Sequence, residues 1–151
     1  MDLNSLIVEP TAKTPLIDMN PLTGELIISG RSIPENAAKV YESINNWVAE
    51  YVKIARRTTN LRLNLEYFNT ASSIWLARIV KTLCSINDPE STLIIHTYFE
   101  IEEFDNLDSD NLRDTLGPII DMIGNTVISV GLKIYGTDEK GEVIKESMIL
   151  I

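Results

Sequence analysis

The sequence predicts an α/β fold, an α+β sandwich in which a mixed β-sheet carries helices mainly on one face. Three observations support this prediction. Apolar residues recur at helical spacing over 37–57 and again over about 72–87. Between these two stretches, residues 61–67 alternate apolar and polar side chains, as a half-buried strand does. Apolar runs rich in β-branched residues follow at 92–99 and 126–135. Strands that alternate with helices are typical of a sheet covered by helices.

Length and charge limit the classes of function. The 151 residues are expected to form one domain, 1–151, and the net charge of −9 is strongly acidic. Because nucleic acids and anionic membranes require a basic surface, neither is an expected partner, whereas other proteins are. The one cysteine, Cys84, is expected to be a small core residue. The chain shows no signal peptide and no apolar run long enough to span a bilayer, so we expect it in the cytoplasm.

The first third of the chain is predicted to contain short antiparallel strands. Residues 1–13 are expected to form a loosely held arm with a short edge strand at 6–8. Strands at 14–19 and 25–29 flank a turn of asparagine, proline and glycine, which predicts a β-hairpin. A polar connection over 30–36 then leads to the first long helix.

Polar residues follow the central strand where the next helix begins. Asn69 or Thr70 is the predicted N-cap, and Ser72 and Ser73 lie in the first turn. Hydroxyls at a helix N-terminus lie among unpaired N–H groups, at the positive end of the helix dipole. Such a position suits a phosphate, on a ligand or on the chain itself. By residue type alone, ordinary capping and a phosphorylation switch at Thr70 both remain open.

The last third combines an acidic segment with further strands. His96 lies in the apolar run at 92–99 and is expected to be a satisfied core or half-buried residue. The carboxylates of 100–110 do not have the spacing of an EF-hand, which favours a solvated acidic rim. A helix is predicted at about 109–123, kinked or broken at Pro118. The strand candidate at 92–99 is expected to be covered on both faces.

The chain ends in a segment that alternates weakly. Residues 136–151 are expected to return as a hairpin strand, which packs on the sheet or on a second subunit, so that a homodimer is one outcome. No Walker A loop, GxGxxG, HExxH, CxxC or GxSxG motif occurs. We therefore expect no cofactor, no metal and no catalytic residues, and a protein that is acted upon or binds partners.

Three blocks of the sequence resemble the SiaC family of bacterial regulatory phosphoproteins. They are the Gly-Arg-Ser-Ile-Pro-Glu-Asn-Ala run of 30–37 with the aromatic residues after it, the Tyr-Phe-Asn-Thr-Ala-Ser-Ser run of 67–73, and Tyr98 followed by acidic residues. Together the similar blocks cover about 14–110. The resemblance implies a compact fold similar to STAS-type anti-sigma-factor antagonists. Ala71 departs from the family pattern, which usually has serine there.

The resemblance also implies a function. Thr70 is the residue that a dedicated kinase would phosphorylate and a PP2C-type phosphatase would dephosphorylate. The unphosphorylated form would bind and activate a diguanylate cyclase, which raises cyclic di-GMP and promotes biofilm formation or aggregation. The residues expected around the phosphate and the partner are Asn69, Ser72, Ser73, Arg31, Pro34, Glu35 and Asn36.

Two other hypotheses come from different classes of function. The helix start at 69–73 could instead form a small anion- or ligand-binding module without a partner protein. Alternatively, a metal bound at Glu102 and Asp105 could make the chain an enzyme.

Overall fold

The fold is a seven-stranded mixed β-sheet with helices packed on one face, as the sequence predicts. The computed structural model describes residues 3–107 and 116–150. Each strand pairs with the next strand in the chain, so the order across the sheet is β1-β2-β3-β4-β5-β6-β7. The pairs from β3 to β6 are parallel, and the outer pairs are antiparallel. The strands are Leu6–Val8 (β1), Leu16–Asn20 (β2), Glu25–Ser32 (β3), Thr58–Phe68 (β4), Thr92–Glu100 (β5), Ser129–Thr137 (β6) and Val143–Leu150 (β7).

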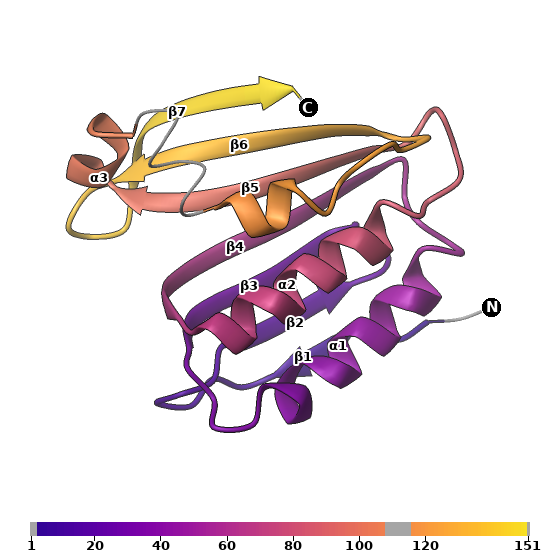
Figure 1. Cartoon of the computed structure of the whole chain (residues 1–151), viewed down its shortest axis with the longest axis horizontal. Coiled ribbons are helices and arrows are strands. Elements are labelled where there is room, and N and C mark those ends of the chain that lie inside the picture. Colours follow the sequence, from indigo (N-terminus) through magenta and orange to yellow (C-terminus); the bar gives the residue numbers. More distant parts are fainter. Residues whose placement is uncertain (1–2, 108–115, 151) are drawn as a thin grey trace.

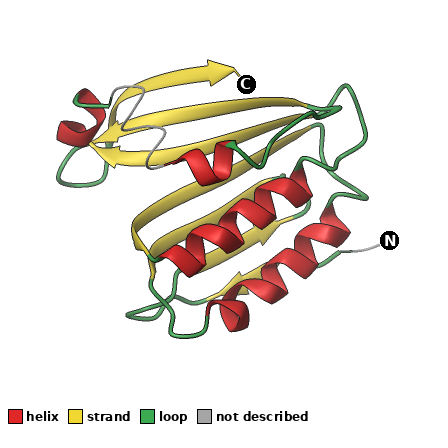
Figure 2. Ribbon diagram, viewed as in Figure 1, coloured by secondary structure: helices red, strands yellow, loops and turns green. Residues whose placement is uncertain are grey.

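The order of the parallel strands explains why the helices share one face. Crossover connections between parallel strands are right-handed. The crossovers from β3 to β6 all step in the same direction across the sheet, so a single hand places every connection on the same side. Helices α1 (Ala37–Tyr51) and α2 (Thr70–Leu83) and the helical residues 116–120 lie on that side. Figure 2 shows the opposite face of the sheet without a helix on it.

The hydrophobic core lies between the sheet and the two long helices. Strand residues that point toward the helices are at most 5% exposed: Ile17, Met19, Leu26, Ile28, Leu61, Leu63, Leu93, Ile95, Val130, Leu132 and Ile134. The helices contribute Tyr41, Ile44, Val48 and Tyr51 from α1, and Leu76, Ile79, Val80 and Leu83 from α2. Burial of each aliphatic side chain contributes roughly 1.5–3 kcal/mol. Cys84 joins this core, and burial raises the pKa of its thiol to about 11.

Helix α1 ends at Tyr51, earlier than the predicted end near residue 57. The chain reverses over the following residues so that β4 can begin at Thr58. The buried phenol of Tyr51 holds this reversal: its oxygen accepts the backbone N–H of Arg56 at 3.2 Å and hydrogen-bonds the Thr59 hydroxyl at 2.9 Å. The sequence pattern did not reveal this end, because the apolar spacing continues past it.

Strand β5 is covered by helices on one face only, so the prediction of cover on both faces was wrong. The other face is shielded by a polar network. The Arg62 guanidinium donates to Glu25 at 2.8 Å and to the Tyr98 hydroxyl at 2.9 Å. Beside it, His96 is 4% exposed and contacts the Tyr135 hydroxyl through Nδ1 at 2.7 Å. Side chains on the open face cover one another, which explains why the sequence of this strand has the apolar pattern of a strand that is buried on both faces.

The ring of His96 is satisfied at both nitrogens, as the sequence predicts. Its Nε2 lies 2.8 Å from the Asn60 side-chain oxygen, which accepts a hydrogen bond. A neutral ring with its proton on Nε2 can therefore donate to Asn60 and accept from Tyr135. Burial, together with the positive charges of Arg62 and Lys133, lowers the pKa of His96 to about 4.

The segment after β5 contains a short helix that the sequence did not predict. Ile101–Asp105 forms this helix, α3, and its Glu102 and Glu103 are exposed, as expected of a solvated acidic rim. Of the predicted helix at 109–123, residues 108–115 lie outside the described residues, and 116–120 are helical and include Pro118. Strand β7 pairs antiparallel with β6 along the outer edge of the sheet, and its residues are all exposed. Among the residues described, no helix is long and apolar enough to cross a membrane.

We predict that His96 makes the fold less stable as the pH falls. The unfolded chain binds a proton at His96 as the pH falls through about 6.5, whereas the folded chain binds it only near pH 4. Proton uptake by the unfolded state between these values favours unfolding, by about 2 kcal/mol between pH 7 and pH 5. Urea unfolding at both pH values measures this loss.

The matched control is His96→Gln, which keeps a polar amide but cannot titrate in this range. The variant should be less stable than the parent at pH 7 and should lose much less stability on going to pH 5. Equal losses for parent and variant would contradict the assignment of the pH dependence to His96.

Candidate functional site

The two sequence blocks that suggested a site meet at one edge of the sheet. Strands β3 and β4 are parallel, so both end at the same edge, and Ser32 pairs with Phe68 at their last register position. The segments that follow them, 33–36 and 69–73, therefore start next to each other. In open α/β sheets this carboxyl edge is where ligands bind.

Asn69 makes three hydrogen bonds where the two segments meet. Its side-chain oxygen accepts the backbone N–H of Ser72 at 2.9 Å, which makes Asn69 the N-cap of α2. Its side-chain amide donates to the Pro34 carbonyl at 3.2 Å. Its own backbone N–H donates to the Ser32 carbonyl at 3.0 Å. One residue thus starts the helix and binds the neighbouring loop, which confirms one of the two predicted caps.

Thr70 is the first residue of α2, and it is exposed. It comes directly after the cap, where the N–H groups of the first turn and the helix dipole favour negative charge. Three large apolar side chains of the adjoining chain segments are also exposed: Ile33 at 38% follows the last residue of β3, Phe68 at 37% ends β4, and Ile74 at 50% lies one helical turn after Thr70. We call Ile33, Phe68, Thr70 and Ile74 the Thr70 surface. Exposed apolar groups next to a polar centre are typical of protein contact sites.

Ser72 lies inside the molecule and not on this surface. It is 0% exposed, and its hydroxyl donates to the Ser32 carbonyl at 3.0 Å. The Ser32 hydroxyl in turn donates to the Ser72 oxygen at 2.8 Å and makes a close hydrogen bond with the Tyr41 phenol. Burial raises the pKa of Tyr41, which therefore remains a neutral hydrogen-bonding partner. These bonds connect β3, α1 and α2 beneath Thr70.

Sequence reasoning missed Ser32 and Tyr41 as parts of the site. Both lie in or near the Gly-Arg-Ser-Ile-Pro-Glu-Asn-Ala block, whereas Ser72, which Ser32 contacts, lies forty residues after Ser32 in the chain. The available signal was a serine and a tyrosine at otherwise apolar, inward-pointing positions. Buried polar side chains usually have hydrogen-bond partners, so such positions predict a network without naming its members.

The remaining predicted neighbours lie along the same edge. Pro34 is buried against Asn69, and Ser73 is half-buried in the first turn of α2. Arg31 is exposed and lies 3.7 Å from the Glu66 carboxylate. Glu35 pairs with Lys13 at 3.1 Å. Asn36 caps α1 by accepting the Lys39 N–H at 3.3 Å, so it orders the other helix at this edge.

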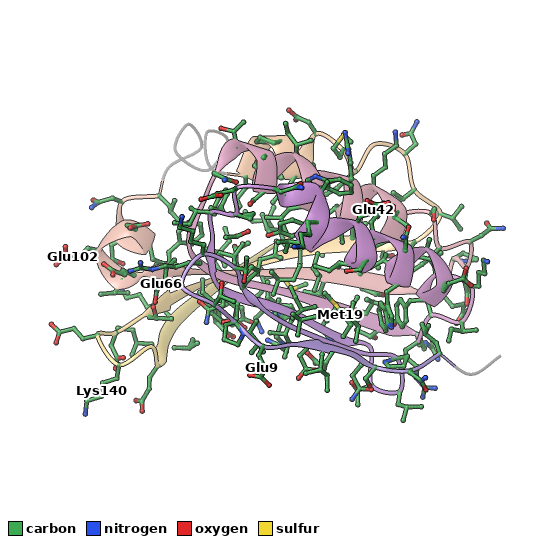
Figure 3. The ribbon with its side chains drawn as sticks, turned by 90° about the horizontal axis from the view of Figure 1, so that it is seen from below. Glu9, Met19, Glu42, Glu66, Glu102 and Lys140 are labelled. Atoms are coloured by element: carbon green, nitrogen blue, oxygen red, sulfur yellow. The ribbon has the colours of Figure 1, made fainter. Side chains whose placement is uncertain are left out.

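The acidic residues proposed as metal ligands do not converge. Asp105 pairs with Lys145 at 2.9 Å, and Glu102 points outward from the end of the molecule (Figure 3). Among the described residues, no group of three or more His, Cys, Asp or Glu side chains is placed to hold a metal ion. The arrangement at Thr70 offers a hydroxyl, a helix N-terminus and apolar groups, which suits modification and protein binding.

Comparison with known proteins shows which family the chain belongs to. Residues 8–112 match the family described as SiaC family regulatory phosphoprotein. The chain belongs to this family. An uncharacterized protein of Pseudomonas aeruginosa (strain UCBPP-PA14) is 31% identical over 70 residues, which span 46% of this chain and 56% of the relative. The chain thus matches little more than half the length of that curated relative.

Solved SiaC structures share the fold. Apo-SiaC from Pseudomonas aeruginosa aligns with a TM-score of 0.64 at 20% identity, over 84% of this chain and 98% of that one. A second SiaC structure from that organism gives 0.59 at 25% identity, over 68% and 90%. SiaC as the activator in complex with the diguanylate cyclase SiaD gives 0.65 at 19% identity, over 83% and 97%.

We predict that Ser72→Ala destabilises the fold although it removes only one oxygen atom. The substitution deletes the bond to the Ser32 carbonyl and leaves the buried Ser32 hydroxyl with one partner fewer. The expected loss is about 1–2 kcal/mol in the free energy of unfolding, measured with urea. Ser73→Ala, at the half-buried neighbouring position, should change stability by less than about 0.5 kcal/mol. Similar effects at both positions would contradict the network.

Proposed function

We propose that this chain is a partner switch in bacterial signalling whose state is set by phosphorylation of Thr70. The unphosphorylated form binds and activates a target protein, a diguanylate cyclase that makes cyclic di-GMP and thereby promotes biofilm formation. A dedicated kinase adds the phosphate and a PP2C-type phosphatase removes it. The protein works in the cytoplasm and is not itself an enzyme. The observation that carries this proposal is the exposed Thr70 hydroxyl at the start of α2.

The fold can accept a phosphate at Thr70 without reorganising. A phosphothreonine carries about −1.5 to −2 charges at neutral pH. At the exposed N-terminus of α2 the helix dipole favours that charge, by roughly 0.3–1 kcal/mol. The side chains that hold this end in place, Asn69, Ser72 and Tyr41, lie behind Thr70 and need not move. Modification therefore changes the surface and leaves the domain folded.

A bound partner, in contrast, would be sensitive to that charge. The Thr70 surface includes the exposed apolar side chains of Ile33, Phe68 and Ile74. A partner that covers these groups also removes water from Thr70. Burial of a dianion without a matched cation costs several kcal/mol, which is enough to abolish micromolar binding. Phosphorylation would thus release the partner by desolvation and not by unfolding.

Two findings support the choice of target and of regulation. The family to which the chain belongs consists of regulatory phosphoproteins. A relative of the same fold, SiaC from Pseudomonas aeruginosa, is the activator in a complex with the diguanylate cyclase SiaD. We propose that the target of this chain is likewise a diguanylate cyclase, one made by the same organism as the chain.

The competing hypothesis, an anion-binding module at 69–73, has less support. It needs several hydroxyls that face the same anion, and Ser72 is buried with its hydroxyl already bonded. The exposed carboxylate of Glu66 also lies on the strand that leads into this segment. A permanent anion pocket is therefore less consistent with the geometry than a residue that is modified transiently.

We predict that Thr70→Glu keeps the fold and loses the partner. The circular dichroism spectrum and urea midpoint should match those of the parent, because the new charge lies at a favourable helix end. Binding to the purified cyclase of the host, measured by calorimetry, should weaken by at least about a hundredfold. The matched control is Ser43→Glu, which places the same charge on an exposed position of α1 and should bind as the parent does. Equal binding by Thr70→Glu and parent would refute the switch.

We also predict that protein isolated from its native host carries phosphate on Thr70. Intact mass before and after treatment with a PP2C-type phosphatase should differ by one phosphate, and peptide sequencing by mass spectrometry should assign it to Thr70. Thr70→Ala protein from the same host should show no such difference. Phosphate found on another residue would overturn the assignment of the site.

A further inference from the structure

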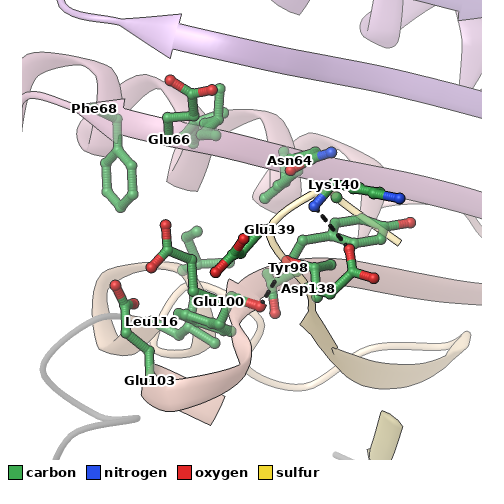
Figure 4. Close-up of a pocket in the computed structure, with 18 residues that line it drawn as sticks. Asn64, Glu66, Phe68, Tyr98, Glu100, Glu103, Leu116, Asp138, Glu139 and Lys140 are labelled. Carbon is green, nitrogen blue, oxygen red and sulfur yellow. Dashed lines mark hydrogen bonds between the residues drawn. The ribbon is translucent and has the colours of Figure 1, made fainter. Parts of the chain in front are cut away.

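Strands β4 and β5 separate toward their carboxyl ends and leave a cleft. Their pairing begins at Thr58 with Thr92 and ends at Leu63 with Thr97. Beyond that point β4 stays paired with β3 as far as Phe68, and β5 stays paired with β6 as far as Glu100. The sheet thus divides into two halves at this edge. A cleft of about 690 Å³ lies between them (Figure 4), within the size range of small-molecule sites.

The cleft has an apolar interior and an acidic rim. The apolar part comes from both halves of the sheet, from α2 and from residues 116–119, and comprises Leu63, Leu65, Phe68, Leu76, Phe99, Leu116 and Ile119. The rim carries five carboxylates, from Glu66, Glu100, Glu103, Asp138 and Glu139, against one ammonium group, from Lys140. Figure 4 shows Glu100, Glu103 and Glu139 on one side of the opening and Glu66 with Phe68 on the other. The lining is therefore amphipathic and strongly negative.

Several of these carboxylates are available to a ligand. Glu66 shares its charge with Arg31 at 3.7 Å, and Asp138 accepts backbone N–H groups of its own turn at 2.9 Å. Within the described part of the chain, the side chains of Glu100, Glu103 and Glu139 have no ion pair and no hydrogen bond. Three charges of one sign around one opening repel each other and attract a cation.

An independent observation at the cleft also indicates a ligand. Thr97 lines the cleft at the point where β4 and β5 part, and it is 4% exposed. Its hydroxyl oxygen is the buried side-chain atom that lacks a hydrogen-bond partner among the described residues. Buried hydroxyls are nearly always bonded, so an unsatisfied one at a cleft wall suggests a missing partner. An N–H donor in the cleft would supply it.

We propose that this cleft binds an organic cation on an aliphatic stem, a guanidinium or primary ammonium group carried by a methylene chain. The stem would contact Leu63, Leu76 and the other apolar residues. The charged head would lie among Glu100, Glu103 and Glu139, so that each of the three charges contributes to its binding, and one of its N–H groups would donate to Thr97. Two sources share this chemistry: a free di- or polyamine, and an arginine or lysine side chain of a partner protein. The proposal does not depend on phosphorylation of Thr70.

The probe that tests the cleft is agmatine, which has a guanidinium at one end of a methylene chain and an ammonium at the other. Agmatine added to the isotope-labelled full chain should shift the amide signals of Thr97, Glu100 and Glu103. In calorimetry, Glu103→Gln should raise the dissociation constant for agmatine by roughly two- to fivefold, which is the effect expected from the loss of one exposed charge pair. The matched control is Glu102→Gln, which removes a neighbouring charge of α3 outside the cleft and should leave the constant unchanged.

A second variant separates binding from structure. Thr97→Val removes the unsatisfied hydroxyl at nearly constant volume, so the variant should be at least as stable as the parent in urea. Its affinity for agmatine should nevertheless fall by about threefold or more, because the ligand loses one hydrogen bond. A merely structural role for Thr97 would instead leave the affinity unchanged.

Comparison of free amines with an arginine peptide distinguishes the sources of the cation. Tighter binding of agmatine and spermidine than of a Gly-Arg-Gly peptide with blocked ends supports a free polyamine. Tighter binding of the blocked peptide supports an arginine side chain of a partner. Absence of shifts at the cleft with every probe, or equal affinities for Glu103→Gln and Glu102→Gln, would overturn the proposal.

Discussion

The parallel pairing of β3 with β4 is the constraint on which the candidate site depends. It continues to the last residues of both strands, Ser32 and Phe68, and so brings together two loops that are far apart in the sequence. The Asn69 side chain then bonds the first loop and caps the helix of the second. A register shift of one residue would turn Ser32 away from Ser72 and separate the loops. Backbone pairing therefore sets the geometry, and side-chain hydrogen bonds make it rigid.

Strand β4 also forms one wall of the cleft. At this edge of the sheet β4 stays paired with β3 and β5 stays paired with β6, so β4 and β5 separate. The Thr70 surface and the cleft both adjoin the carboxyl end of β4, and they differ in charge and polarity. The Thr70 surface is apolar around one hydroxyl, whereas the cleft has three unpaired carboxylates in the described part of the chain. Phe68 belongs to both surfaces. One structural edge can therefore offer a modifiable contact and a cation site without using the same polar groups.

Polar groups serve different purposes on the two faces of the sheet. On the helix face they are few, and Ser32, Ser72 and Tyr41 satisfy one another beneath the start of α2. On the open face, Arg62, Glu25, His96 and their neighbours form a bonded layer that takes the place of helices. A charged or aromatic side chain that covers its neighbour can bury a strand without a second layer of structure.

Local patterns determined most of the elements. Period-2 alternation predicted β4 and β6, a continuous apolar run predicted β5, and a turn between two short apolar runs predicted β2 and β3. Helical spacing predicted α1 and α2, and polar residues after an apolar strand predicted a cap at Asn69 or Thr70. These signals are local, because each depends on residues within about one turn or one strand. The early end of α1 at Tyr51, the burial of Ser72 and the bare face of β5 depend on contacts between distant segments. The cleft exists only because β4 and β5 each keep another partner. Which strand pairs with which is decided by the tertiary structure, because the sequence of one strand does not show which other strand will lie beside it.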